Sequence, residues 1–242
     1  MKKLVRKVAG ALGYDIVRIS KPESHLFQIG EVKYVADPCS VGETPQGELT
    51  ARGAIRMIGE RQLKHLRVLD MCCGVGIIGL TMYSTLRESL AIKGAAFADI
   101  NIFNLNSLHK TLTANNLQRV VGDEIHVWLT SGLSNIPAGE RFDIIVSNPP
   151  HFFSKAFREQ DSPLSPHVLG TFDAGWDFHR AFYANCHNYL NDSGEVWFLE
   201  NGEGASDSDL LPFIEVNKAL KYMNTIDEPL LPGFFWMISR RA

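Results

Sequence analysis

The chain has 242 residues, 45% of them hydrophobic, and a formal net charge of −3 at pH 7. This size and apolar content suffice for one α/β domain with an N-terminal extension, and the slight negative charge argues against a globally basic nucleic-acid binder. The apolar stretches have the length of strands and no signal-peptide core follows the first lysines, so a soluble, cytoplasmic protein without membrane contact is expected.

The first 48 residues are predicted to form an extension or cap. Residues 1–20 are expected to form a helix and then a short strand, and residues 27–35 a further strand or hairpin. Basic residues gather near the start of the chain: Lys2, Lys3, Arg6, Lys7, Arg18 and Lys21. Two interpretations stay open for this cluster, an arm that binds RNA or another polyanion, and the ordinary solvated face of a surface helix.

A strand that ends in a glycine turn is predicted at residues 68–76, after a helical run at 49–62. Asp70 ends the strand, and small residues lead through a tight turn into a helix near Ile77, so a ligand can approach the backbone closely. The glycines also fit the dinucleotide-binding pattern, with a candidate ribose-binding acid about twenty residues later: Gly74, Gly76, Gly79 and then Asp99. The segment therefore indicates a nucleoside cofactor, either NAD or S-adenosylmethionine.

The charge of Asp70 distinguishes these two cofactors. An anion in front of the turn would repel a pyrophosphate, whereas it would attract the ammonium and sulfonium groups of S-adenosylmethionine. The sequence therefore favours S-adenosylmethionine.

A second motif, Asn148-Pro149-Pro150-His151, follows a predicted strand at residues 142–146. Because proline has no N–H group, this strand end offers mainly hydrogen-bond acceptors. The Asn148 side-chain oxygen and the Pro149 carbonyl suit the two hydrogens of a substrate NH2 group, and they would turn the nitrogen lone pair toward an electrophile. The alternative is a turn that simply ends the strand.

The long irregular stretch at residues 151–177 is the candidate substrate lid, because a loop of this length inside a compact domain usually carries function. Its aromatic and basic residues next to the second motif are candidates for substrate contact: Phe152, Phe153, Lys155 and Arg158. The alternative is an ordered surface loop whose aromatic side chains pack down.

Strands and helices alternate along the rest of the chain. Strands are predicted at 95–98, 125–129, 142–146, 195–200 and 234–239, and helices at 104–115, 178–190 and 210–220. This alternation predicts an α/β fold with a Rossmann-like, doubly wound, mostly parallel sheet and helices on both faces. Ligands of such sheets bind at the carboxyl ends of the strands, where four polar residues would meet: Asp70, Asp99, Ser131 and Asn148.

Together the two motifs resemble the class I S-adenosylmethionine-dependent methyltransferases of the amino-methylating kind, over roughly residues 65–200. In that family the first strand and turn read hydrophobic-Leu-Asp-x-Gly-x-Gly-x-Gly, and the fourth strand ends in Asn, Asp or Ser, then Pro-Pro and an aromatic residue. The resemblance implies a methyltransferase domain at residues 49–242 with an antiparallel edge strand and S-adenosylmethionine as cofactor.

The resemblance also implies roles for single residues. Asp99 and Ile100 match the segment that binds the ribose hydroxyls, and Ser131 stands where many relatives have an aspartate near the adenine amine. Thr44 lies in a segment that resembles the one placed over the methionine end of the cofactor, although a plain helix-entry loop is an equal interpretation. Asn148 would contact both the cofactor and the acceptor.

The chain departs from the family pattern at two positions. Cys72 stands where the first glycine of the turn is usual, which removes some freedom at positive φ. His151 replaces the tyrosine, phenylalanine or tryptophan that stacks on the target group, so stacking falls to His151 or Phe152.

The mechanism implied by the resemblance is an in-line displacement at the sulfonium methyl group, in which the protein mainly aligns and desolvates the reactants. The first choice of acceptor is an exocyclic amine of a base in rRNA or tRNA, which the basic N-terminal cluster favours. A glutamine amide in a protein and a small molecule are the alternatives. Two hypotheses of another functional class stay open: the protein is an NAD-dependent oxidoreductase, or it binds the cofactor without catalysis.

No metal is expected. The cysteines form no Cys-x-x-Cys pair and the histidines lack His-Glu-x-x-His spacing, so reduced thiols and no zinc site are predicted.

Overall fold

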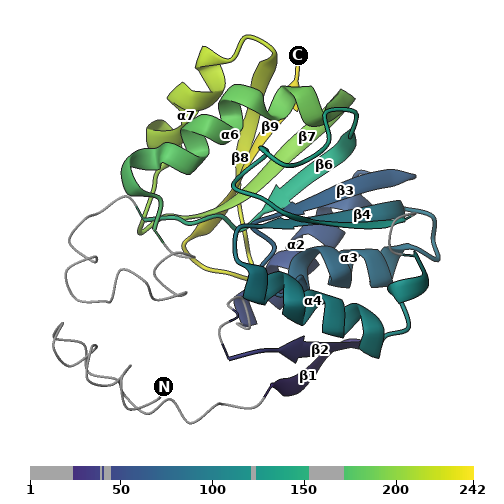
Figure 1. Cartoon of the computed structure of the whole chain (residues 1–242). Coiled ribbons are helices and arrows are strands. Elements are labelled where there is room, and N and C mark those ends of the chain that lie inside the picture. The colour runs from purple at the N-terminus through teal and green to yellow at the C-terminus, as the bar shows by residue number, and fades with distance from the viewer. Residues whose placement is uncertain (1–23, 39, 41–44, 121–123, 153–171) are drawn as a thin grey trace, which may run out of the picture.

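The computed structural model describes residues 24–38, 40, 45–120, 124–152 and 172–242. Its centre is a seven-stranded sheet with the strand order β5-β4-β3-β6-β7-β9-β8 (Figure 1). The strands are β3 (Leu66–Met71), β4 (Ile92–Asp99), β5 (Ile125–Leu129), β6 (Phe142–Ser147), β7 (Leu190–Asn201), β8 (Leu220–Asp227) and β9 (Phe234–Arg241). The first five strands of that order pair in parallel, and β9 is antiparallel to both of its neighbours.

Helices cover both faces of this sheet, as Figure 1 shows. Residues of α2 (Pro45–Glu60), α3 (Ile77–Leu86) and α4 (Ile102–Ala114) pack into one hydrophobic cluster, and residues of α6 (Asp177–Asn185) and α7 (Asp207–Val216) pack into the other. Short 3-10 helices connect some of these elements: η1 (Gln118–Val120), η3 (Ala174–Trp176) and η4 (Cys186–Tyr189). The predicted Rossmann-like, mostly parallel sheet is therefore confirmed.

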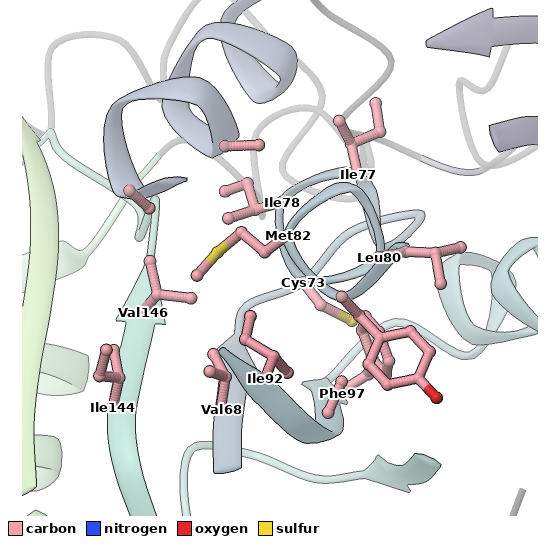
Figure 2. Packing of buried hydrophobic residues seen from close by; sticks show 14 of the residues in the cluster. Val68, Cys73, Ile77, Ile78, Leu80, Met82, Ile92, Phe97, Ile144 and Val146 are labelled. Carbon is pink, nitrogen blue, oxygen red and sulfur yellow. The ribbon is translucent and has the colours of Figure 1, made fainter. Parts of the chain in front are cut away.

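The strands next to the centre of the sheet are apolar on both faces because helices lie on each side. In β3, Val68 points into the cluster of α2, α3 and α4, whereas Leu69 belongs to the cluster of α6 and α7. Figure 2 shows Val68 packed among Ile92, Ile144 and Met82. This packing fixes the two central strands β3 and β6, whose carboxyl ends carry the two motifs.

A hairpin precedes the sheet. Strands β1 (His25–Ile29) and β2 (Val32–Ala36) pair antiparallel, and β2 packs on α4, where the Val35 N–H donates to Thr111 Oγ1 at 2.9 Å. The hairpin agrees with the strand or hairpin expected at 27–35. The helix and strand expected at 1–20, with the basic cluster, lie outside the described residues.

Several predicted element ends differ from the structure. The helix expected at 49–62 begins earlier, at Pro45, a residue that suits the first turn because it lacks an N–H group. The helix expected at 178–190 ends at Asn185 and gives way to η4, since Leu190 already belongs to β7. Strand β8 was not predicted. It forms the edge of the sheet, so the antiparallel strand β9 lies one position inside that edge.

Within the described part of the chain, no helix is both long and apolar enough to cross a membrane.

Candidate active site

The two motifs lie side by side at the carboxyl ends of neighbouring strands. Strands β3 and β6 are paired in parallel with Met71 opposite Ser147, and Ser147 Oγ donates to the Met71 carbonyl at 2.5 Å. The glycine turn after β3 and the turn that begins at Asn148 after β6 therefore start side by side. Both turns lie just outside the carboxyl ends of the strands, the region where ligands of doubly wound sheets bind and which is here termed the crevice.

The glycine turn runs through left-handed backbone conformations. Cys72 has a φ of 58°, so the residue that replaces the usual glycine adopts a conformation that L side chains disfavour. At Gly76, with a φ of 85°, an added Cβ would lie only 2.6 Å from Leu108 Cδ1. The turn therefore depends on glycine for both its dihedral angles and its close approach to α4.

Asp70 is completely buried beneath this turn. Its Oδ2 accepts from the Gly79 N–H at 2.8 Å, whereas its Oδ1 is buried without a hydrogen-bond partner. The pKa of Asp70 is raised to about 7, because burial and the charge of Asp99 raise it more than the Gly79 hydrogen bond lowers it. A buried acceptor with no partner is a site that a bound cation can satisfy.

Gly79 allows α3 to approach Asp70. A Cβ at this position would lie 2.8 Å from the Asp70 Cβ and 2.8 Å from Phe97 Cε1, so Gly79→Ala is expected to destabilise the fold by about 1–3 kcal/mol. Gly59→Ala is the matched control, because Gly59 is also helical and has nothing within 4 Å of an added Cβ. It should be neutral or stabilising by up to about 1 kcal/mol. Urea unfolding measures both, and equal stability of the two variants would contradict the close contact.

Asp99 ends β4 and connects the glycine turn to the start of α4. Its Oδ2 accepts from the Gly74 N–H at 2.8 Å, and its Oδ1 accepts from the Asn101 N–H at 2.7 Å and from Asn104 Nδ2 at 3.1 Å. Burial raises the pKa of Asp99. Ile100, the next residue, is 65% exposed and presents an apolar side chain at the edge of the crevice.

Asn148 is the first residue of the turn after β6 and contacts Gln46 of α2. Its Oδ1 accepts a long hydrogen bond from Gln46 Nε2, at 3.4 Å, and lies 2.7 Å from His151 Nε2. Asn148 and Pro150 are half-buried and Pro149 is buried. The motif is thus held from both sides while Asn148 keeps access to the crevice.

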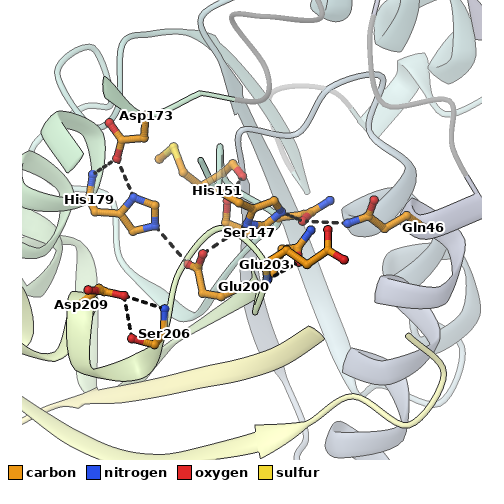
Figure 3. A network of polar contacts seen from close by, with 12 residues as sticks. Gln46, Ser147, His151, Asp173, His179, Glu200, Glu203, Ser206 and Asp209 are labelled. Atoms are coloured by element: carbon orange, nitrogen blue, oxygen red, sulfur yellow. Dashed lines mark hydrogen bonds and ion pairs between the residues drawn. The ribbon is translucent and has the colours of Figure 1, made fainter. Parts of the chain in front are cut away.

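A buried chain of polar contacts extends from this motif into the protein (Figure 3). His151 Nδ1 lies 3.2 Å from Glu200 Oε2, and Glu200 Oε1 lies 3.1 Å from His179 Nε2. His179 Nδ1 lies 2.6 Å from Asp173 Oδ2. Burial alone would lower the pKa of His179, but the charges and hydrogen bonds of Glu200 and Asp173 outweigh it and raise the pKa to about 9.

Ser131 follows β5 and is exposed. The N–H of the preceding Thr130 donates to the Asp99 carbonyl at 2.9 Å, which places this loop beside the end of β4. Ser131 also lines a pocket of about 710 Å³ between its loop and α6, together with Leu133, Phe178 and Phe182. The structure therefore brings Ser131 near Asp99 and Ile100.

Four of the predicted site residues lie outside the described residues: Thr44, Phe153, Lys155 and Arg158. Phe152 is half-buried and pairs through a single β-bridge with Phe172. Over the ranges that the structure describes, no group of three or more histidine, cysteine, aspartate or glutamate side chains is arranged to hold a metal ion.

Sequence reasoning missed the polar residues that surround the second motif: Gln46, Asp173, His179 and Glu200. Each is far from the motif in sequence, and only the fold brings them together. Glu200 had one sequence signal, since a carboxylate that ends the apolar run of β7 must lie at the carboxyl edge of the sheet.

The order of the strands and the helices on both faces of the sheet give the fold of the class I S-adenosylmethionine-dependent methyltransferases. The model of the family described as Methyltransferase small domain matches residues 54–161 of this chain.

Two curated relatives illustrate the similarity. Ribosomal RNA small subunit methyltransferase C of Haemophilus influenzae is 37% identical over 84 residues, which cover 35% of this chain and 22% of the relative. Release factor glutamine methyltransferase of Clostridium botulinum is 32% identical over 160 residues, which cover 64% of this chain and 53% of the relative. The chain thus spans from about a fifth to about half the length of these relatives.

Solved structures share the fold. A 16S rRNA methyltransferase from T. thermophilus, solved in complex with AdoMet and guanosine, has a TM-score of 0.63 at 17% identity, covering 100% of this chain and 62% of that one. An S-adenosylmethionine-dependent methyltransferase from Clostridium acetobutylicum has a TM-score of 0.55 at 11% identity, covering 80% and 91% of the two chains. At these identities the likeness concerns the fold alone.

Proposed function

We propose that this protein transfers the methyl group of S-adenosylmethionine to a planar exocyclic amine or amide nitrogen, most readily that of a base in cytoplasmic rRNA or tRNA. The observation that carries this proposal is the pairing of Met71 with Ser147. It brings the acid-and-glycine turn, which suits a cationic nucleoside, next to the Asn-Pro-Pro turn, which suits an NH2 group. A donor site and an acceptor site therefore share one crevice.

The residues at the glycine turn fit S-adenosylmethionine. Asp70 and Asp99 are both buried acids with a raised pKa, and Asp70 Oδ1 lacks a partner. Such a pair favours a ligand that carries positive charge and disfavours a pyrophosphate. Asp70 would face the charged methionine end, Asp99 would accept from a ribose hydroxyl, and Ile100 and Ser131 would border the adenine.

The bound cofactor supplies an electrophilic methyl group. Asn148 Oδ1 and the Pro149 carbonyl accept hydrogen bonds from the two N–H groups of the acceptor and so direct the lone pair of its nitrogen. Pro150 restricts the turn that carries them. These residues act by alignment, through an Asn148 amide that contacts Gln46 and His151.

The class of acceptor is inferred from the relatives and from the chain's own residues. An rRNA methyltransferase and a release factor glutamine methyltransferase both resemble this chain, and a guanine amine and a glutamine amide are both planar NH2 groups. The basic cluster at residues 2–21 favours RNA. A glutamine in a protein is the second candidate, since the match to the release factor glutamine methyltransferase covers a larger share of the chain than the match to the rRNA methyltransferase.

Cofactor affinity should depend on pH through Asp70. Its pKa of about 7 means that the carboxyl is mostly neutral at pH 6 and mostly ionised at pH 8. A cationic ligand binds the ionised form, so the affinity for S-adenosylhomocysteine, which retains the ammonium group, should rise about tenfold over this range. Calorimetric titration measures it. Asp70→Asn should bind weakly and without this pH dependence, and an unchanged pH profile in the variant would contradict the role of Asp70.

The proposed function is tested with S-adenosylmethionine that carries a radioactive methyl group. The protein is incubated with a cell extract that contains RNA, and the labelled product is digested with nuclease or with protease. Label released by nuclease supports the RNA acceptor, and label released by protease moves the acceptor to a protein amide. If the protein binds S-adenosylhomocysteine but labels neither fraction, the proposal of a macromolecular acceptor is wrong.

A further inference from the structure

Figure 3 shows the buried polar chain formed by Asp173, His179, Glu200 and His151. This chain ends on Asn148, because His151 Nε2 lies 2.7 Å from Asn148 Oδ1. We propose that this chain positions the Asn148 amide for methyl transfer, and that His151 therefore acts through Asn148 and does not stack on the acceptor. The inference rests on the proposed function, in which Asn148 holds the acceptor nitrogen. It names the residues that keep Asn148 in place. It makes His151 and Glu200 positioning residues.

His151 has little surface for stacking. Only 9% of its side chain is exposed. The rings of Phe152 and Phe234 meet it nearly at right angles, with centroids 6.4 Å and 5.9 Å away. The backbone carbonyl of His151 also lies close to Gly204, where an added Cβ would approach it within 2.5 Å, so the turn that carries the ring is packed against the segment after β7. An acceptor base cannot lie flat on a ring enclosed in this way, whereas the half-buried Phe152 keeps accessible surface.

The contacts of His151 instead suit a residue that fixes the orientation of the Asn148 amide. Charge and hydrogen bonds from the two histidines lower the pKa of Glu200 against its burial, so Glu200 is ionised at neutral pH and His151 Nδ1 must donate to it. This bond fixes the imidazole plane. The opposite ring nitrogen, Nε2, then lies 2.7 Å from Asn148 Oδ1 and decides which end of the amide faces the crevice.

Either form of that nitrogen holds the amide. A protonated Nε2 donates to Oδ1, and an unprotonated Nε2 accepts from the amide NH2 group once the amide has turned over. The second arrangement leaves Oδ1 facing the crevice, where it accepts from the NH2 group of the acceptor. Without His151, the long contact with Gln46 at 3.4 Å would be left to hold the amide.

The inner half of the chain holds Glu200 in place. His179 on α6 contacts Glu200 Oε1, and the carboxylate of Asp173 accepts from the backbone N–H groups of Phe178 and His179 at 2.9 Å and 3.1 Å. Three separate parts of the fold are therefore connected to Asn148: the start of α6, the end of β7 and the turn after β6. Such support is what keeps a reacting group within the narrow tolerance of catalysis.

Two substitutions of His151 distinguish positioning from stacking. His151→Phe keeps an aromatic ring and restores the residue type that the family uses for stacking, but it removes both hydrogen bonds. We expect kcat to fall about 10- to 100-fold with the affinity for S-adenosylhomocysteine unchanged. His151→Gln keeps a donor and an acceptor without a ring, and should recover most of the loss. His109→Phe, at an exposed position on α4, is the matched control and should not change kcat.

A double-variant cycle shows whether His151 acts through Asn148. In the Asn148→Ala background, His151→Phe should cause no further loss of kcat, because the group that it positions is gone. Glu200→Gln should lower kcat several-fold, while Glu215→Gln, at an exposed position on α7, should leave it unchanged. Full activity of His151→Phe, or losses that add in the double variant, would overturn the proposal in favour of stacking or of an independent role.

A measurement without turnover separates this inference from the proposed function. In protein labelled with 15N-asparagine, the side-chain amide signals of Asn148 are identified by their loss in Asn148→Ala. Their exchange with water should become faster in His151→Phe and stay unchanged in His109→Phe. If the wild type transfers no methyl group, the proposed function fails, but unchanged exchange in His151→Phe is the result that overturns the positioning role.

Discussion

Asn148→Ala is expected to lower methyl-transfer turnover by about 10²- to 10³-fold. The substitution removes the side-chain oxygen that accepts one N–H of the acceptor, and the Pro149 carbonyl alone cannot fix the direction of the nitrogen lone pair. The affinity for S-adenosylhomocysteine should fall far less than turnover, because Asp70, Asp99 and the glycine turn, which belong to other strands, still hold the cofactor when the expected contact of Asn148 is lost. Single-turnover methylation of the identified acceptor measures the first quantity, and calorimetry the second.

Asn106→Ala is the matched control for this experiment. Asn106 is exposed on α4, outside the crevice residues described above, so its replacement should leave turnover unchanged. Turnover of Asn148→Ala within about twofold of the wild type would mean that the Asn-Pro-Pro turn does not hold the acceptor, and methylation of oxygen or carbon would then be the better explanation.

His179→Gln is expected to cost about 3–5 kcal/mol of folding free energy near pH 6.5. His179 is fully buried between the carboxylates of Asp173 and Glu200, both of which have a lowered pKa. Removal of the imidazolium leaves the buried carboxylates of Asp173 and Glu200 without the positive charge that lies between them. Urea unfolding of the wild type and the variant measures the difference.

The contribution of His179 should also depend on pH in a defined direction. The pKa of His179 is raised from 6.5 to about 9 in the folded protein, so the folded state binds the proton more tightly than the unfolded state does. The resulting stabilisation, of the order of 3 kcal/mol, is fully present below pH 6.5 and is lost as the pH rises to about 9. The gap in stability between the wild type and His179→Gln should therefore narrow over that range.

The control is His109→Gln, since His109 is exposed. Its stability should follow that of the wild type at every pH. If His179→Gln unfolds at the same urea concentration as the wild type at pH 6.5, or if the gap between them is equal at pH 6.5 and pH 9, then His179 does not bridge the two carboxylates as a cation.

The fold could be predicted well from the sequence where patterns are local. Strand β5 was predicted with its observed bounds, and the glycine turn and the Asn-Pro-Pro turn were predicted at the ends of β3 and β6. Strand β8 was missed because its side chains are mostly exposed or half-buried, which leaves no clear alternation of apolar and polar residues. It is recognisable as a strand only through its pairing with β9.

The candidate site was predicted only in part. Motif spacing pointed to Asp70, Asp99 and Asn148, since each lies at or next to the carboxyl end of a strand. The chain of Asp173, His179 and Glu200 could not be found in this way, because its residues come from a turn, a helix and a strand that meet through tertiary packing. For the same reason the sequence left open whether His151 or Phe152 stacks, a choice that depends on burial.

The measurement that tests the central claim most directly is the location of the transferred methyl group in the isolated product. The labelled macromolecule is digested to nucleosides or amino acids, and mass spectrometry identifies the atom that carries the label. A methyl group on an exocyclic base nitrogen or on a glutamine amide nitrogen is the predicted result. A methyl group on ribose oxygen or on a base carbon would contradict the proposed role of the Asn-Pro-Pro turn.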